Sequence, residues 1–154
     1  MLTTCWRRPI IWRGDPESQA NLRRAVSTAY YALFHLLIDE AVGKWSVARQ
    51  RSILARTFDH KTMKTVCQDH VKTFFSSGQP ARGVSLKNVA WAFVHLPEKR
   101  HTADYDIAFD WDRTNAIGQI DLAAEAFKNW QEVRETEEAQ DYLLSLFLPR
   151  APRQ

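Results

Sequence analysis

The sequence predicts an all-α protein, an up-and-down bundle of four to five helices. Apolar residues recur every three or four positions through several long stretches, which is the period of a helix with one buried face. Only five of 154 residues are glycine, about half the usual ~7%. No proline occurs between Pro16 and Pro80, and such a chain is a poor candidate for a turn-rich β fold.

The size and composition of the chain predict one domain. Hydrophobic residues make up 45% and charged residues 25% of the sequence, as in an average soluble globular protein. We expect an N-terminal arm over residues 1–14, a single helical domain over 15–148 and a basic tail over 149–154. No internal repeat divides this domain.

The first helix is predicted to begin at Asp15, Pro16 and Glu17 and to end at Gly43, because these residue types favour helix ends. Its apolar residues form two neighbouring stripes. One stripe contains Leu22, Val26, Ala29, Leu33 and Leu36, and the other contains Tyr30, Phe34, Leu37 and Ala41. So wide an apolar arc predicts a helix that is covered on two sides, either in the centre of the bundle or at a dimer interface.

The middle of the chain predicts two further helical regions. Residues 46–76 form one bent helix or two shorter ones, with Ile53, Leu54 and Phe58 on one apolar face and residues from Met63 to Phe75 on the next. Ser85 is expected to cap the following helix. Pro97 is expected to kink or break that helix near residues 94–97, because an interior proline removes a backbone hydrogen bond.

The last third of the chain predicts a loop and a final long helix. Residues 101–113 mix acidic and aromatic side chains without a helical period and are expected to form an ordered loop. Asp112 or Thr114 then caps the helix, followed by a final apolar patch around Tyr142, Leu143, Leu146 and Phe147. The inward face of this helix is expected to carry Ile117, Ile120, Ala124, Phe127 and Trp130.

Charge and cysteine content narrow the classes of function. The net charge of +3 permits an anionic partner without requiring one. Cys5 and Cys67 are far apart and form no CxxC pair, so neither a zinc site nor a disulfide framework is predicted. No apolar run reaches the ~18–20 residues that span a bilayer. We therefore expect a cytoplasmic protein with no membrane segment, metal or cofactor.

Two segments carry a resemblance to a known family. Residues 23–35 read RRAVSTAYYALFH, and residues 96–106 read LPEKRHTADYD. In this order they resemble the AYYA…FH and RHxADYD branch of the HEPN superfamily, over roughly residues 15–135. The resemblance implies a small prokaryotic helical bundle that often dimerises. It also implies association with RNA, or with a nucleotidyltransferase partner in toxin–antitoxin and defence modules.

Many members of this superfamily are metal-independent ribonucleases with an arginine five to seven positions before a histidine. None of the five histidines here has an arginine at those positions. The resemblance therefore implies an RNA- or nucleotide-associated protein without the usual ribonuclease signature. Two alternatives are a divergent endoribonuclease that uses Arg100 with His101 or His35, and a non-catalytic protein-interaction module.

The candidate site residues gather around the two motifs. Arg100 can bind a phosphate through two parallel hydrogen bonds, and His101 beside it is of the residue type that most often transfers protons in enzymes. Alternatively, Arg100 pairs with Asp104 or Asp106 and fixes the loop. One of Tyr30 and Tyr31 is expected to face the core. The candidate binding residues are Arg24, Tyr31, His35, Arg100, His101, Asp104 and Tyr105.

Two basic groups form a second candidate surface. Arg7, Arg8 and Arg13 alternate with Trp6 and Trp12, and a further group contains Arg49, Arg51 and Arg56. These arginines form either an RNA-facing patch or a solvated basic surface.

The second apolar stripe of the first helix predicts a homodimer. One bundle interior normally covers one broad face of a helix, so Tyr31, Phe34, His35 and Ile38 are expected to remain partly exposed. A contiguous apolar patch of this kind usually marks an interaction site, and twofold self-association is the commonest way to bury it.

Overall fold

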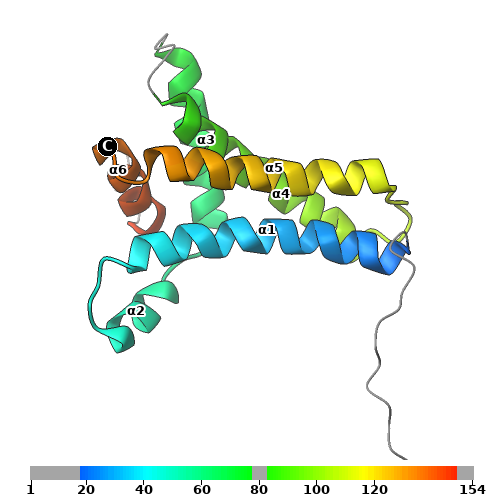
Figure 1. Cartoon of the computed structure of the whole chain (residues 1–154), viewed down its shortest axis with the longest axis horizontal. Helices are drawn as coiled ribbons and strands as arrows, with labels where there is room; N and C mark the ends of the chain where they lie inside the picture. The colour runs from blue at the N-terminus through cyan, green and yellow to red at the C-terminus, as the bar shows by residue number, and fades with distance from the viewer. Residues whose placement is uncertain (1–17, 78–82, 149–154) are drawn as a thin grey trace, which may run out of the picture.

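The computed structural model describes residues 18–77 and 83–148, and this part of the chain contains six helices and no strand (Figure 1). The predicted arm, the predicted tail and the predicted helix start at Asp15–Glu17 lie outside the described residues. The all-α class and the helical bundle are confirmed, but the described residues form six helices where four to five were predicted. The helices are α1 (Gln19–Val42), α2 (Ala48–Ala55), α3 (His60–Ser76), α4 (Val84–Tyr105), α5 (Arg113–Val133) and α6 (Glu137–Phe147).

Three long helices form the body of the protein. Helices α1, α4 and α5 pack against one another, α3 crosses α4 steeply, and α6 packs against α3 (Figure 1). Polar contacts join both ends of α1 to its neighbours. Arg23 lies against the end of α4, and Arg134, just after α5, pairs with Glu40 at 2.9 Å.

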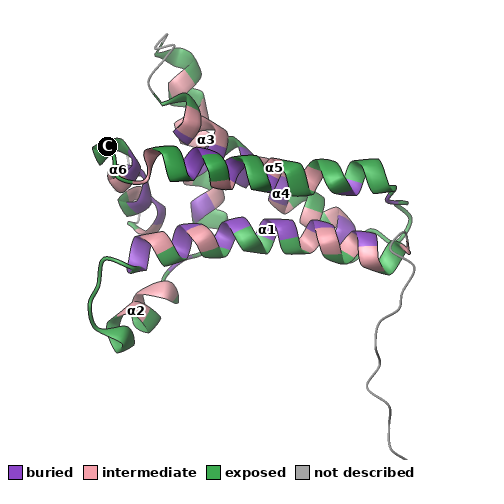
Figure 2. Ribbon diagram, viewed as in Figure 1, coloured by how far each residue is buried: buried purple, intermediate pink, exposed green. Residues whose placement is uncertain are grey.

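Both apolar stripes of α1 are buried, as the wide apolar arc predicts (Figure 2). Leu33 and Leu37 are fully buried, and Phe34 and Ile38 are only 7% and 5% exposed. The expectation that Phe34 and Ile38 remain partly exposed is therefore wrong. The reason is that other helices of the same chain cover both sides of α1, so that no second copy is needed to bury them.

The ends of α1 follow local rules. Ser18 caps its start, since the Ser18 side chain accepts a hydrogen bond from the backbone N–H of Asn21. Gly43 caps the other end, as predicted, and its N–H donates to the carbonyl of Asp39 at 2.9 Å.

Helix α4 is longer than the sequence predicts. It passes through Pro97 without a break and continues to Tyr105, so the predicted break at 94–97 is absent. The loop predicted over residues 101–113 is wrong for 101–105, which are helical, but residues 106–112 do connect α4 to α5 without a helix. Phe93 and Leu96, which precede Pro97, are fully buried, and Ala103 beyond it is 3% exposed. Packing on both sides of the proline thus offsets the one missing hydrogen bond.

The start of α4 also differs from the prediction. Gly83 holds the N-cap position with φ of +92°, a left-handed conformation that glycine adopts without steric cost. Ser85 therefore lies inside the helix, where its hydroxyl donates to Glu132 of α5 at 2.9 Å.

Helix α5 is capped by Asp112, one of the two predicted caps, whose carboxylate accepts from the backbone N–H of Asn115 at 2.7 Å.

The inward face predicted for α5 is wrong for Ile117 and Ile120, which are 41% and 42% exposed, and for Ala124, which is also exposed. Phe127 is partly buried, and Trp130 is fully buried as predicted. Three alanines face α1 and α4 instead, at Ala116, Ala123 and Ala126. Small side chains allow helices to approach closely, so the alanines take the inner face and the isoleucines remain outside.

Residues 46–76 form two helices rather than one bent helix. Asp59 separates them by capping α3, and its carboxylate accepts from the backbone N–H of Thr62 at 2.8 Å. The apolar faces predicted here are only partly buried, because Ile53 and Phe75 are 53% and 69% exposed. Cys67 is a free thiol that lies 3.0 Å from the Tyr142 hydroxyl of α6, and burial raises its pKa to about 12. Cys5 lies outside the described residues.

Candidate functional site

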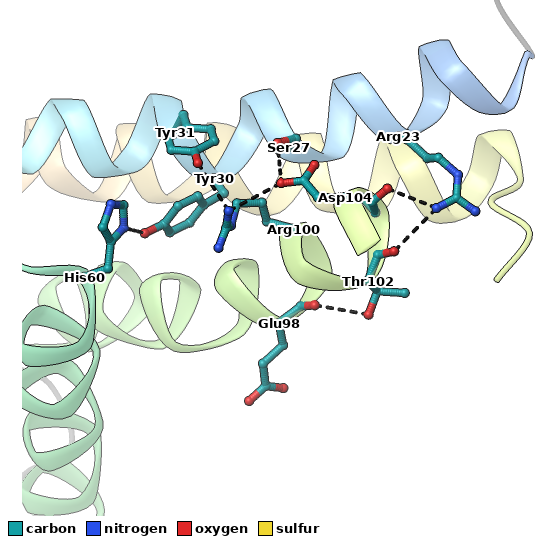
Figure 3. A network of polar contacts seen from close by, with 10 residues as sticks. Arg23, Ser27, Tyr30, Tyr31, His60, Glu98, Arg100, Thr102 and Asp104 are labelled. Atoms are coloured by element: carbon teal, nitrogen blue, oxygen red, sulfur yellow. Dashed lines mark hydrogen bonds and ion pairs between the residues drawn. The ribbon is translucent and has the colours of Figure 1, made fainter. Parts of the chain in front are cut away.

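A polar and aromatic cluster connects α1, α4 and the first residue of α3 (Figure 3). Helix α1 contributes Tyr30 and Tyr31, which are 1% and 36% exposed. Adjacent helical positions point about 100° apart, so one tyrosine enters the core while its neighbour reaches the surface. This division was predicted from the sequence.

Arg100 of α4 is the centre of the cluster. The Cζ atom of its guanidinium lies 5.4 Å from the ring centroid of Tyr30 and 5.6 Å from that of Tyr31, within the range of cation–π attraction. Its Nη1 donates to the Tyr31 hydroxyl at 3.2 Å and to the Asp104 carboxylate at 3.3 Å. Among the described residues its Nε is buried and has no hydrogen-bond partner. Arg100 thus presents a positioned guanidinium with unused donor capacity.

Asp104 is the acidic partner that the structure selects. It lies one turn after Arg100 on α4 and also accepts a hydrogen bond from the Ser27 hydroxyl at 3.4 Å (Figure 3). The carboxylate of Asp106 instead accepts from the backbone N–H of Ala108. Of the two predicted pairings for Arg100, the one with Asp104 is therefore present.

His60 is the member of the site that sequence reasoning missed. A hydrogen bond joins its Nδ1 to the Tyr30 hydroxyl, and its ring stacks on Phe34. Burial, followed by the positive charge of Arg100, lowers the pKa of His60 below its ordinary value, so the imidazole is neutral at pH 7. Burial raises the pKa of Tyr30, which stays protonated.

No spacing in the sequence indicates that His60 meets Arg100. The two residues are 40 positions apart on different helices, and the only local signal at His60 is its position just after the cap Asp59. That signal predicts a helix start and not a site.

The other predicted site residues divide into two groups. His35 belongs to the cluster, because its ring centroid lies 6.4 Å from that of Tyr31 on the exposed side of α1. Arg24 is exposed on the same face of α1, two turns before Tyr31. His101 and Tyr105 instead pair with each other at 5.0 Å on an exposed face of α4. No hydrogen bond or ion pair within the described residues joins either of them to Arg100.

The chain matches no protein-family model, no curated protein and no solved structure. Membership of the HEPN superfamily therefore stays a prediction.

Two further properties of the described residues bear on the site. Residues 18–77 and 83–148 contain no group of three or more histidine, cysteine or acidic side chains placed to hold a metal ion. The helices in these ranges include none that combines the length and apolar character needed to cross a membrane.

Of the two basic groups predicted to form a second surface, only the group on and after α2 lies within the described residues. Arg49 and Arg51 lie on α2, and Arg56 follows it. Arg51 donates to the carbonyls of Trp45 and Ser46, at 2.7 and 2.9 Å. The other basic group, Arg7, Arg8 and Arg13 with Trp6 and Trp12, lies outside the described residues.

Proposed function

We propose that this protein binds a phosphate group of RNA or of a nucleotide at Arg100. The observation that carries the proposal is the guanidinium of Arg100, which is fixed beside the rings of Tyr30 and Tyr31 while its side chain stays 23% exposed. Arginine is also the side chain best shaped for phosphate.

The surroundings of Arg100 favour a nucleotide over a simple anion. The exposed rings of Tyr31 and His35 lie next to the guanidinium and supply faces on which a base can stack. Arg24 adds positive charge two turns away on the same face of α1. A phosphate contact with adjoining stacking surfaces is the usual arrangement for single-stranded nucleic acid.

The HEPN resemblance supports the same proposal and suggests its setting. It suggests a toxin–antitoxin or defence module with a nucleotidyltransferase-type partner. Because the family's arginine–histidine spacing is absent, binding without the usual cleavage motif is the function we propose.

A divergent ribonuclease is the second candidate, and the position of His60 near Arg100 favours it. His60 is neutral and close enough to Arg100 for the arginine charge to lower its pKa, so it could accept a proton from a ribose hydroxyl. In this alternative His60 takes the role that the sequence assigned to His101 or His35.

Fluorescence anisotropy with labelled single-stranded RNA tests the proposal. We expect Arg100→Ala to weaken binding by about tenfold or more, the effect of losing one charged hydrogen bond. The matched control Lys128→Ala removes one exposed positive charge from α5 and is expected to bind almost as the wild type does. Equal binding by Arg100→Ala and the wild type would contradict the proposal.

The same RNA, analysed on a gel after incubation, tests the second candidate. Cleavage that is lost in both Arg100→Ala and His60→Asn would establish a ribonuclease. A protein that binds no RNA but copurifies with one stoichiometric protein would instead support the interaction-module alternative.

A further inference from the structure

A basic and apolar stripe covers the outward side of α2. Arg49, Ile53 and Arg56 follow one another at spacings of four and three, so they share one face, and all three are exposed. No residue of α2 is buried. Between Ala41 and Phe58 the chain contains Lys44 and three arginines but no acidic residue. Within the described residues, the side chains of Arg49 and Arg56 form no ion pair.

Helix α6 carries a stripe of the opposite charge. Glu137, Asp141, Leu144 and Leu148 follow at spacings of four, three and four and are all exposed, so acidic groups occupy the start of the stripe and leucines its end. Leu144 and Leu148 are 46% and 48% exposed. In the described part of the chain, neither Glu137 nor Asp141 has a side-chain ion pair.

The two stripes lie at the same end of the molecule. Phe58, just after α2, packs against Phe147 of α6 with ring centroids 5.6 Å apart. Both helices also pack against α1, and Figure 1 shows them at the end of the bundle where α1 finishes. This end of the protein therefore has a basic and apolar side next to an acidic and apolar side.

We propose that a second copy of this chain covers this end, with α2 of each copy lying against α6 of the other. A twofold axis produces two identical contacts. If α2 of the first copy lies against α6 of the second, then α2 of the second copy also lies against α6 of the first. Each contact places unpaired arginines opposite unpaired carboxylates and Ile53 opposite exposed leucines. This interface differs from the one predicted on α1, whose apolar residues Phe34 and Ile38 are already buried.

Charge reversal on each stripe tests the interface by sedimentation equilibrium. The wild type is expected at twice the chain mass of 17.9 kDa. The double variant Arg49→Glu/Arg56→Glu and the double variant Glu137→Arg/Asp141→Arg are each expected to be monomeric. Mixing the two is expected to restore a dimer, because each copy then offers the other a complementary charge in both contacts.

A matched control separates the interface from overall charge. Lys99→Glu/Lys128→Glu makes the same change in net charge as the reversal on α2 but alters exposed lysines of α4 and α5, so it is expected to remain dimeric. Raising the salt from about 0.1 M to about 1 M is expected to weaken the wild-type dimer, since the screening length falls from about 10 to 3 Å.

Four results would overturn the proposal. They are a wild type that stays monomeric at high micromolar concentration, a charge-reversal variant that remains dimeric, a mixture that stays monomeric, and a wild type larger than a dimer. Glu137 stabilises the first turn of α6. If circular dichroism shows that the α6 double variant has unfolded, Asp141→Arg alone replaces it in every comparison.

Discussion

The imidazole ring of His60 lies flat on the ring of Phe34, with centroids 3.9 Å apart and planes 7° apart. This stack attaches the first residue of α3 to the middle of α1. It also covers Phe34, which the sequence alone suggested would face a second copy. The same imidazole is hydrogen-bonded to Tyr30 and lies near Arg100, so the stack belongs to both the core and the candidate site.

Stability is expected to fall below about pH 6.5 because of two histidines. Burial is the largest cause of the lowered pKa of both His60 and His70, whose ordinary value is 6.5. As the pH falls through this range, the unfolded chain takes up protons that the folded protein resists, so the free energy of unfolding decreases. Above this pH range, both histidines are neutral in the folded and the unfolded protein, so they contribute no pH dependence to its stability.

Urea denaturation between about pH 5 and pH 8 measures this effect. The variant His60→Gln is expected to show a smaller decrease in unfolding free energy over the same range, whatever its stability at pH 8. A wild type with constant stability between pH 5 and pH 7 would show that neither pKa is lowered.

Phe34→Glu is expected to unfold or strongly destabilise the protein. The side chain at this position is 7% exposed and contacts His60 and Phe93, so a carboxylate would lose water without gaining a partner. We expect a loss of at least about 3 kcal/mol in thermal or chemical unfolding. Tyr31→Glu, at the exposed neighbouring stripe, serves as the control and should cost far less. Comparable stability for both variants would mean that Phe34 lies outside the core.

Arg23→Ala is expected to loosen the end of α4. The Arg23 guanidinium donates to the carbonyls of Thr102, Ala103, Asp106 and Phe109, of which the last two lie beyond the helix. Losing these charged hydrogen bonds is expected to cost about 1–2 kcal/mol. Arg23→Lys should not restore the stability, because an ammonium cannot match the planar fork of donors.

Hydrogen exchange locates the effect of Arg23. Faster exchange is expected in Arg23→Ala at the backbone amides from Asp106 to Trp111, with little change in α5. Uniformly faster exchange along the whole chain would instead show that Arg23 supports global stability and not this segment.

Pro97→Ala is expected to stabilise the protein. Alanine supplies the N–H that proline lacks, so one more helical hydrogen bond can form in α4, and the strain of the proline ring is removed. Because α4 is already continuous, the gain is expected to be about 1–3 kcal/mol, measured as a higher melting temperature. Lower stability would mean that contacts of the partly buried proline ring outweigh the lost hydrogen bond.

Local signals in the sequence predicted the helices and part of their packing. The period of apolar residues identified α1 and its two buried stripes, and the residue types Asp112 and Gly43 predicted caps that the structure contains. Such features depend on neighbours within four residues along the chain, so the sequence contains all the information they need.

The ends of α4 show where local signals failed. Pro97 and the acidic, aromatic residues after it predict a break and a loop. The helix nevertheless continues because Phe93 and Leu96 are buried against other helices and because Arg23, 79 positions from Thr102, supplies donors for its final carbonyls. Tertiary contacts can outweigh a local preference of a few kcal/mol, and the sequence period does not reveal them.

The sequence by itself determined the helical class and the two apolar stripes of α1, because each depends on short-range spacing. It left the acidic partner of Arg100 open between Asp104 and Asp106. Only the tertiary structure decided which face of α5 is buried, since close helix packing favours Ala123 over the larger Ile120. It alone also brought His60 to Tyr30 and Arg100. The spacing of residues along a helix predicts which side chains share a face. The way the helices pack against one another determines which residues contact that face.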